Sequence, residues 1–193
     1  EVGHTLGLPH NFGSSNAYPV DSLRSATFTQ RMGTAPSIMD YARFNYIAQP
    51  EDAGVALMPD VGEYDKYAIA WGYRPILEAN SAEEELPTLR KWIDDKNGDP
   101  MYRYGRQGNS NDYTAQSEDL GDDAMKASMY GIKNLKVIMT NLRDWTYVQG
   151  SDYTELGEMY GEVQSQFNRY MGHVGRYVGG VKEDYKSSDQ EGV

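Results

Sequence analysis

The sequence predicts a mostly α-helical protein with little sheet. Apolar residues recur at three- and four-residue spacing through most of the chain after about residue 61, which is the pattern of amphipathic helices. Alternating apolar and polar residues between turn residues, the pattern of strands, are scarce. A short turn around Gly150 separates two long periodic segments and predicts an antiparallel helical hairpin.

Composition limits the classes of function. The chain has 193 residues, enough for one substantial core, and a net charge of -11 without clustered Lys and Arg, which argues against a nucleic-acid partner. No apolar run approaches the roughly 20 residues that a membrane span requires. Cysteine is absent, so thiolate ligands, thiol nucleophiles and disulfides are excluded. Any metal site must therefore use histidines and carboxylates.

Two parts of the chain differ in character. Residues 1–75 begin with a short helix and continue, to about residue 60, as irregular chain rich in Gly, Pro and Asn, so we expect this part to carry the site. Residues 76–193 are expected to form a helical extension packed against the first part. Within it, the polar stretch RYGRQGNSNDYTAQSEDLGDD is predicted to be a loop.

Two shorter helices are predicted before this loop. Asp60 is a candidate N-cap for a helix that runs to about Trp71 and ends at Gly72. Ser81, followed three residues later by Glu84, predicts a capping box at the start of the next helix.

Two long helices are predicted after the loop, and these form the hairpin. The first is indicated by Met125, Met129, Ile132, Leu135, Met139, Leu142 and Trp145. The second is indicated by Leu156, Met159, Val163, Phe167, Tyr170, Val174 and Tyr177. Gly179 and Gly180 are expected to end it.

The opening stretch EVGHTLGLPH has the spacing of a partial metal site. A histidine directly before Glu1 would stand one helical turn from His4, and both would reach one zinc ion. His10 joins them only if the helix breaks, because six further residues turn it far round the axis. Gly7 adopts a positive φ at least cost and Pro9 discourages helix, so the break is predicted in the right interval.

Three imidazoles leave a fourth zinc position open for water, which is the catalytic pattern. Glu1 would act as the general base that takes a proton from this water, and later as the proton donor to the leaving amine. The competing interpretation is a helix that carries Glu1 and His4 as solvated side chains. Gly7 and His10 favour the metal site, and we expect the chain to begin one residue after its first histidine.

The same stretch, followed by SIMDY at Ser37 to Tyr41, resembles the metzincin zinc endopeptidases, whose long motif is HExxHxxGxxH and whose Met-turn passes beneath the metal. The resemblance implies a role for six residues: His4 and His10 as zinc ligands, Glu1 as general base, Gly7 as the bend, Met39 as the Met-turn methionine and Tyr41 as a catalytic residue. Tyr41 matches a tyrosine that some metzincins use as an extra ligand or to stabilise the tetrahedral intermediate. Without the family, Met39 would be interpreted as an ordinary core methionine.

Further stretches carry the resemblance along the chain. GEYDKYAIAWGY is similar to the closing helix of the matrixin catalytic domain, which makes residues 1–75 resemble a metzincin C-terminal subdomain. RYGRQ, SEDLGDDAMKAS and VGGV resemble a group of large bacterial zinc-dependent metalloproteases. This resemblance implies an extracytoplasmic location, and it implies that the tail KEDYKSSDQEGV is also a cut end.

Two hypotheses are open for the acidic segment SEDLGDD, which contains Glu118, Asp119, Asp122 and Asp123. It could bind calcium or position substrate. Alternatively, it caps the following long helix and complements the helix dipole, which is the interpretation that we favour.

Five other polar or aromatic residues have alternative interpretations. His173 is predicted to be a surface histidine, because no other ligand type stands at useful spacing. Arg103 and Arg106 would either hold a substrate carboxylate or lie in a solvated loop, and we favour the loop. Tyr102 and Tyr104 would line a cleft if that loop folds back toward the metal.

The sequence therefore indicates part of a zinc metalloendopeptidase that hydrolyses a peptide or protein substrate by zinc-activated water, without a covalent intermediate. Because the first zinc histidine is missing, we expect the chain alone to bind zinc weakly and to be inactive. The alternative is a non-catalytic helical scaffold or binding module with a vestigial metal motif. The residue that precedes Glu1 in the parent protein separates the two hypotheses.

Overall fold

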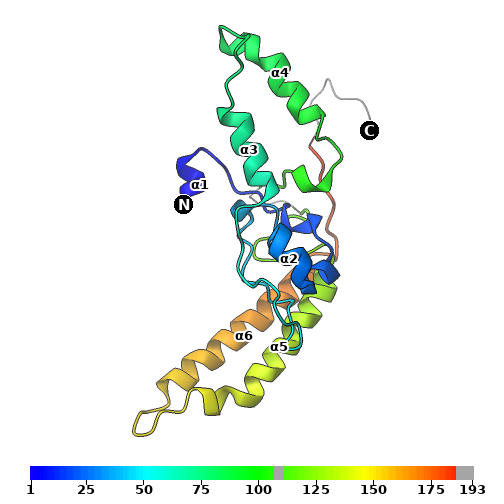
Figure 1. Ribbon diagram of the computed structural model, residues 1–193. Coiled ribbons are helices and arrows are strands. Elements are labelled where there is room, and N and C mark those ends of the chain that lie inside the picture. The colour runs from blue at the N-terminus through cyan, green and yellow to red at the C-terminus, as the bar shows by residue number, and fades with distance from the viewer. Residues whose placement is uncertain (107–110, 186–193) are drawn as a thin grey trace.

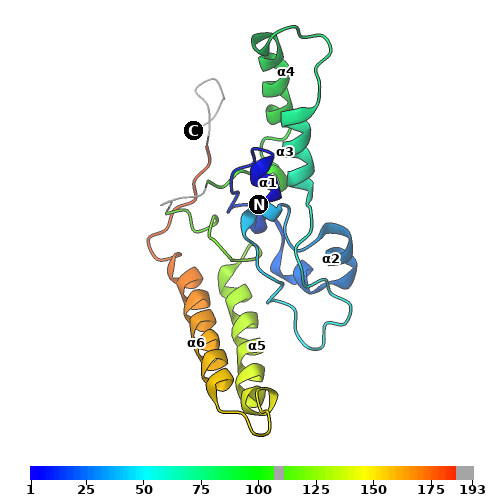
Figure 2. The same ribbon diagram turned by 90° about the vertical axis from the view of Figure 1, so that its left-hand side faces the viewer.

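The computed structural model describes residues 1–106 and 111–185. Within these ranges it has six α-helices and no β-strand, which confirms the mostly α fold. The molecule is elongated: α3 and α4 project at one end, the α5–α6 hairpin projects at the other, and irregular chain around α2 lies between them (Figures 1 and 2). Gln107 of RYGRQ and most of the tail KEDYKSSDQEGV lie outside the described residues.

The N-terminal part holds more helix than the sequence predicted. After α1 (Val2–Thr5) come the 3-10 segments Ser15–Ala17, Val20–Arg24 and Ile38–Asp40, together with the α-helix α2 (Ala26–Met32). The prediction of irregular chain was wrong at α2. Its start signal is Ser25, whose hydroxyl accepts a hydrogen bond from the Phe28 N–H, and its stop signal is Gly33, with φ +72°.

The next helix, α3 (Glu63–Tyr73), begins later than predicted. Gly62 occupies the N-cap position, and the Asp65 carboxylate accepts its N–H at 2.9 Å. The prediction of Asp60 as the cap was wrong, because tertiary packing decides the start. A Cβ at Gly62 would collide with the Pro36 carbonyl, so only glycine allows this approach.

In α4 (Ala82–Asp94) the predicted capping box is half formed. The Ser81 hydroxyl accepts the Glu84 N–H at 3.3 Å, as expected. The Glu84 carboxylate accepts the N–H of Asn80 instead of Ser81, at 2.8 Å. Trp71 in α3 links the two helices, because its indole N–H donates a hydrogen bond to a carbonyl of α4.

The long helices α5 (Ala124–Trp145) and α6 (Thr154–Gly175) form the predicted antiparallel hairpin. They approach closely at Gly131, where an added Cβ would lie 2.6 Å from the Tyr170 ring. The last helix ends at Gly175, before the predicted stop at Gly179 and Gly180. None of the helices in the described ranges is long and apolar enough to cross a membrane.

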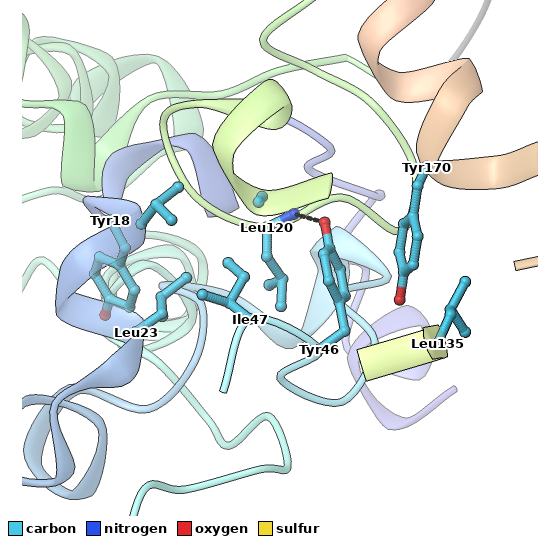
Figure 3. Close-up of a cluster of buried hydrophobic side chains, with 9 residues drawn as sticks. Tyr18, Leu23, Tyr46, Ile47, Leu120, Leu135 and Tyr170 are labelled. Atoms are coloured by element: carbon cyan, nitrogen blue, oxygen red, sulfur yellow. Dashed lines mark hydrogen bonds between the residues drawn. The ribbon is translucent and has the colours of Figure 1, made fainter. Parts of the chain in front are cut away.

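One buried cluster joins the N-terminal part to the hairpin (Figure 3). It consists of Tyr18, Val20, Leu23, Tyr46, Ile47, Leu120, Ala127, Leu135 and Tyr170. The Tyr46 and Tyr170 rings lie 4.8 Å apart, and the Tyr46 hydroxyl accepts the Leu120 N–H at 3.1 Å. This core therefore draws on both predicted parts, 1–75 and 76–193, and it holds the segment that carries the candidate site against the hairpin.

Candidate metal centre

The first helix ends in a bend that brings the chain back toward its own start. The Gly7 N–H donates to the His4 carbonyl at 2.9 Å, and the Leu8 N–H donates to the Gly3 carbonyl at 3.0 Å. These two bonds are the Schellman arrangement, which requires a left-handed residue. Gly7 is this left-handed residue, with φ +82°. The helix therefore stops where the spacing predicted, between His4 and His10.

This bend brings the two N-terminal histidines together. The ring centroids of His4 and His10 lie 4.5 Å apart, with the ring planes at 83°. The His4 Nδ1 lies 2.9 Å from the Leu8 carbonyl, and the His10 Nδ1 lies 3.2 Å from the Met39 carbonyl. A carbonyl oxygen only accepts hydrogen bonds, so in the neutral rings Nδ1 carries the proton. Each Nε2 then keeps a lone pair for a metal, as metal-binding histidines commonly do.

Met39 lies beneath the short helix. Its side chain is buried, and a Cβ added at Gly3 would collide with its sulfur atom. Its carbonyl accepts the Asn11 N–H at 3.0 Å as well as the His10 ring hydrogen bond. The turn at residues 37–41 therefore positions both the Met39 side chain beneath the helix and the His10 imidazole.

Tyr41 flanks the pair of histidines. Its ring stacks on that of His10, with centroids 4.3 Å apart. Its backbone is left-handed, with φ 61°, which is uncommon for a residue with a bulky side chain. Such backbone strain often accompanies functional sites. Half of the side chain is exposed, so the phenol can be reached from solvent.

The described residues do not complete a metal site by themselves. Within residues 1–106 and 111–185 no group of three or more His, Cys, Asp or Glu side chains could hold a metal ion. His4 and His10 fit two of the positions of a zinc site, because each offers a neutral imidazole nitrogen.

A family model described as Met-zincin matches residues 1–193. The chain belongs to the Met-zincin family.

Membership confirms the metzincin resemblance carried by EVGHTLGLPH and SIMDY. It supports a zinc metallopeptidase-like fold for this Met-zincin chain, and it implies zinc binding in the family generally. No curated protein and no solved structure matches the chain.

Asp65 supports the candidate site, and its role was not predicted from the sequence. From α3 its buried carboxylate accepts the Ser37 hydroxyl at 2.6 Å and the Ile38 N–H at 2.9 Å, in addition to the Gly62 N–H. It therefore fixes the 37–41 turn to the start of α3. The signal for it was the aspartate within GEYDKYAIAWGY, a stretch interpreted only as helix.

Asn11 is a second missed residue, directly after His10. Its fully buried amide donates to the Arg103 carbonyl at 3.0 Å and accepts the Gly105 N–H at 2.7 Å. These bonds draw the polar loop back to the site. Sequence offers no local signal for Asn11, because its partners lie about 90 residues away along the chain.

The predicted solvation of Arg103 was therefore wrong. Its guanidinium donates to the Asp112 carboxylate at 2.6 Å and to the Thr114 hydroxyl at 2.7 Å. The folded-back loop buries this group, which becomes a structural ion pair. Tyr102 packs against the Tyr67 ring of α3 at 5.2 Å, while Tyr104 is partly exposed. The backbones of Arg106 and Asn11 pair in an isolated β-bridge.

The acidic segment SEDLGDD divides into separate roles in this Met-zincin chain. Asp123 caps α5, since its carboxylate accepts the N–H groups of Met125 and Lys126, each at 3.0 Å. Asp122 accepts the Val20 N–H at 3.0 Å. Glu118 pairs with two arginines, Arg43 and Arg169. The helix cap that we favoured for this segment is therefore formed by Asp123. Asp119 is buried.

His173 is not a surface residue, so that prediction was wrong. It is 6% exposed, and its Nε2 lies 3.0 Å from the Ser117 carbonyl. Burial lowers the pKa of its imidazole, and the positive charges of Arg169 and Arg176 lower it further. The loop that carries Ser117 covers the end of α6, which sequence periodicity alone does not reveal.

Proposed function

We propose that His4 and His10 are two zinc ligands, and Glu1 the general base, of a zinc metalloendopeptidase. The third ligand would be a histidine directly before Glu1 in the parent protein, as the HExxHxxGxxH motif requires. The supporting observation is the pairing of the His4 and His10 rings, each with its Nδ1 on a backbone carbonyl. Both Nε2 atoms are thereby prepared for a metal.

The residues around this pair have distinct roles in the proposed reaction. Zinc, when bound, would lower the pKa of a coordinated water to about 7 and polarise the peptide carbonyl. Glu1 stands at the N-cap position of α1 and is exposed, so it can take a proton from water and deliver it to the leaving amine. Tyr41 would donate a hydrogen bond to the carbonyl oxygen of the substrate.

Met39 would act as the Met-turn methionine of this centre. Its packing against Gly3 supports a positioning role beneath the helix, with no contact to substrate. The substrate would be a peptide or protein. An extracytoplasmic location is also proposed, and it rests on the family resemblance alone.

Hydrolysis by the full-length parent protein tests the role of Glu1. We expect Glu1→Ala to lower peptide hydrolysis by about 100-fold or more, because general base catalysis contributes this much, while zinc content stays unchanged. Glu83→Ala on α4, an exposed acid, is the matched control and should keep full activity. Equal activity of Glu1→Ala and the parent protein would refute the assigned base.

The 193-residue chain itself provides a second test. We expect it to retain little zinc after dialysis against a weak chelator and to show no peptidase activity, because two imidazoles bind zinc less tightly than three. Tightly bound zinc at one ion per chain would contradict the proposed ligand set. A parent protein without a histidine before Glu1 would instead favour the scaffold hypothesis.

A further inference from the structure

The α5–α6 hairpin carries an open, largely apolar groove along one of its faces. The groove has a volume of about 660 Å³ and is lined by residues of these two helices alone. Met139 of α5 and Phe167 of α6 line it, and each is 43% exposed. The hairpin projects from the rest of the molecule, as both views show (Figures 1 and 2). Apolar surface that stays exposed in this way marks a candidate interaction site.

The side chains that line the groove form one row on each helix. On α5 the row contains Ile132, Lys136 and Met139, at four- and three-residue spacing. On α6 it contains Tyr160 and Phe167, two turns apart. A furrow between two such rows is the shape into which the side-chain ridge of a third helix packs. Amphipathic helices bind grooves of this kind through apolar residues on one of their faces.

The charge of the groove is positive. Lys136 lines it, and Arg143 lies two turns further along the same face of α5. None of the lining residues is acidic. The acidic residue Glu162 of α6 lines a different cavity, which lies between the hairpin and residues 44–50. Since the chain as a whole carries a net charge of -11, this positive groove differs from the average surface.

The two cations of the groove also differ from the other lysines of α5. Lys126 pairs with Asp21, and Lys133 pairs with Glu51, so these lysines bind neighbouring parts of the fold. Among the described residues, neither Lys136 nor the arginine beyond it forms an ion pair. Their charges are therefore available to an acidic partner.

We propose that this groove binds an amphipathic helix of a partner protein, with acidic residues beside its apolar face. The apolar side chains would pack between the two rows, and the carboxylates would pair with Lys136 and Arg143. The same groove of a second copy is a poorer match, because it would bring like charges together without an acid. The proposal does not rest on the peptidase hypothesis, because the groove shares no residue with the candidate metal centre.

Binding of a designed peptide to the 193-residue chain tests the proposal. The fluorescent probe is a helix of about 18 residues, or five turns, with Leu along one face and Glu on the flanks. The control peptide carries Lys in place of every Glu. We expect the acidic peptide to bind at least about 10-fold more tightly, and its affinity to fall as salt is added. Equal binding of the two peptides, or no binding of either, would overturn the proposal.

Substitutions on α5 locate the binding face. Met139→Asp and Lys136→Glu should each weaken binding of the acidic peptide by about 10-fold or more. Lys136→Glu should also improve binding of the lysine peptide, because it reverses the charge of the groove. Val137→Asp is the matched control, since Val137 is 40% exposed but points about 200° away round the helix.

All three variants should keep the circular dichroism of the parent chain, because the replaced side chains are exposed. Retained affinity in Met139→Asp and Lys136→Glu, or an equal loss in Val137→Asp, would contradict the assignment of the groove.

Two other occupants of the groove would give different results. A second copy of the chain would appear in sedimentation as a dimer that Met139→Asp dissociates, without binding of the peptide. An anionic lipid surface would appear as sedimentation of the chain with phosphatidylserine vesicles, again without binding of the peptide. Either result would overturn the proposal of a helical protein partner.

Discussion

Single residues decide whether the opening stretch can act as a metal site. Gly7 and the two histidines were predictable, because helix periodicity alone requires a break between His4 and His10. Their Nδ1 partners were not predictable, since the Met39 carbonyl lies 29 residues from His10 along the chain. Local spacing therefore indicated which side chains meet, while tertiary packing determined which nitrogen of each ring remains available.

Gly7→Ala tests the bend. Because φ is +82° and no described atom would lie within 4 Å of the new Cβ, the cost is conformational. We expect the free energy of unfolding to fall by about 1 kcal/mol. Gly161→Ala in α6 also meets open space, but its backbone is helical, so it should instead raise stability by about 1 kcal/mol. Urea unfolding of both variants measures the difference, and equal effects would contradict the assignment of Gly7.

His173 predicts a dependence of stability on pH. Burial lowers its pKa in the folded state, so the unfolded chain binds the proton more readily below the ordinary value of about 6.5. The stability that neutral His173 provides is therefore present above that pH and is lost as the pH falls below it. Denaturant unfolding of wild type and His173→Gln at several pH values isolates this effect, because other groups cancel in the difference. A pH-independent difference would contradict it.

At the scale of elements, long periodic segments were predicted well and short ones poorly. The apolar residues of α5 and α6 recur at helical spacing over 22 residues in each helix, so their periodicity is unmistakable. The seven-residue α2 shows too few turns for a periodic signal. The start of α3 was misplaced because contact with the Pro36 carbonyl, rather than the local capping preference, selects Gly62.

Asp65→Ala tests what fixes α3 to the turn beneath the candidate centre. It would leave the Ser37 hydroxyl and the Ile38 and Gly62 N–H groups without their acceptor. We expect a loss of about 3 kcal/mol in the free energy of unfolding, because these hydrogen bonds are buried and charge-assisted. Asp60→Ala is the matched control, since the exposed Asp60 carboxylate accepts only the neighbouring Val61 N–H among the described hydrogen bonds. Similar losses in both variants would contradict the account.

At the scale of the whole molecule, contacts between distant segments build the site. Asn11 binds the loop at Arg103 and Gly105, and the core joins Tyr46 to Leu120 and Tyr170. These pairings were outside the reach of sequence reasoning, because no local pattern specifies them. The mostly α class and the family resemblance were within its reach, since they rest on periodicity and on short motifs.

The central claim is that His4 and His10 bind one zinc ion together, and the zinc content of the protein with the histidine proposed before Glu1 tests it most directly. The account predicts one zinc per chain in that protein and in its His173→Gln control. It predicts loss of that zinc in both His4→Ala and His10→Ala, with the helical content unchanged. Zinc retained at one ion per chain in either alanine variant would contradict the claim.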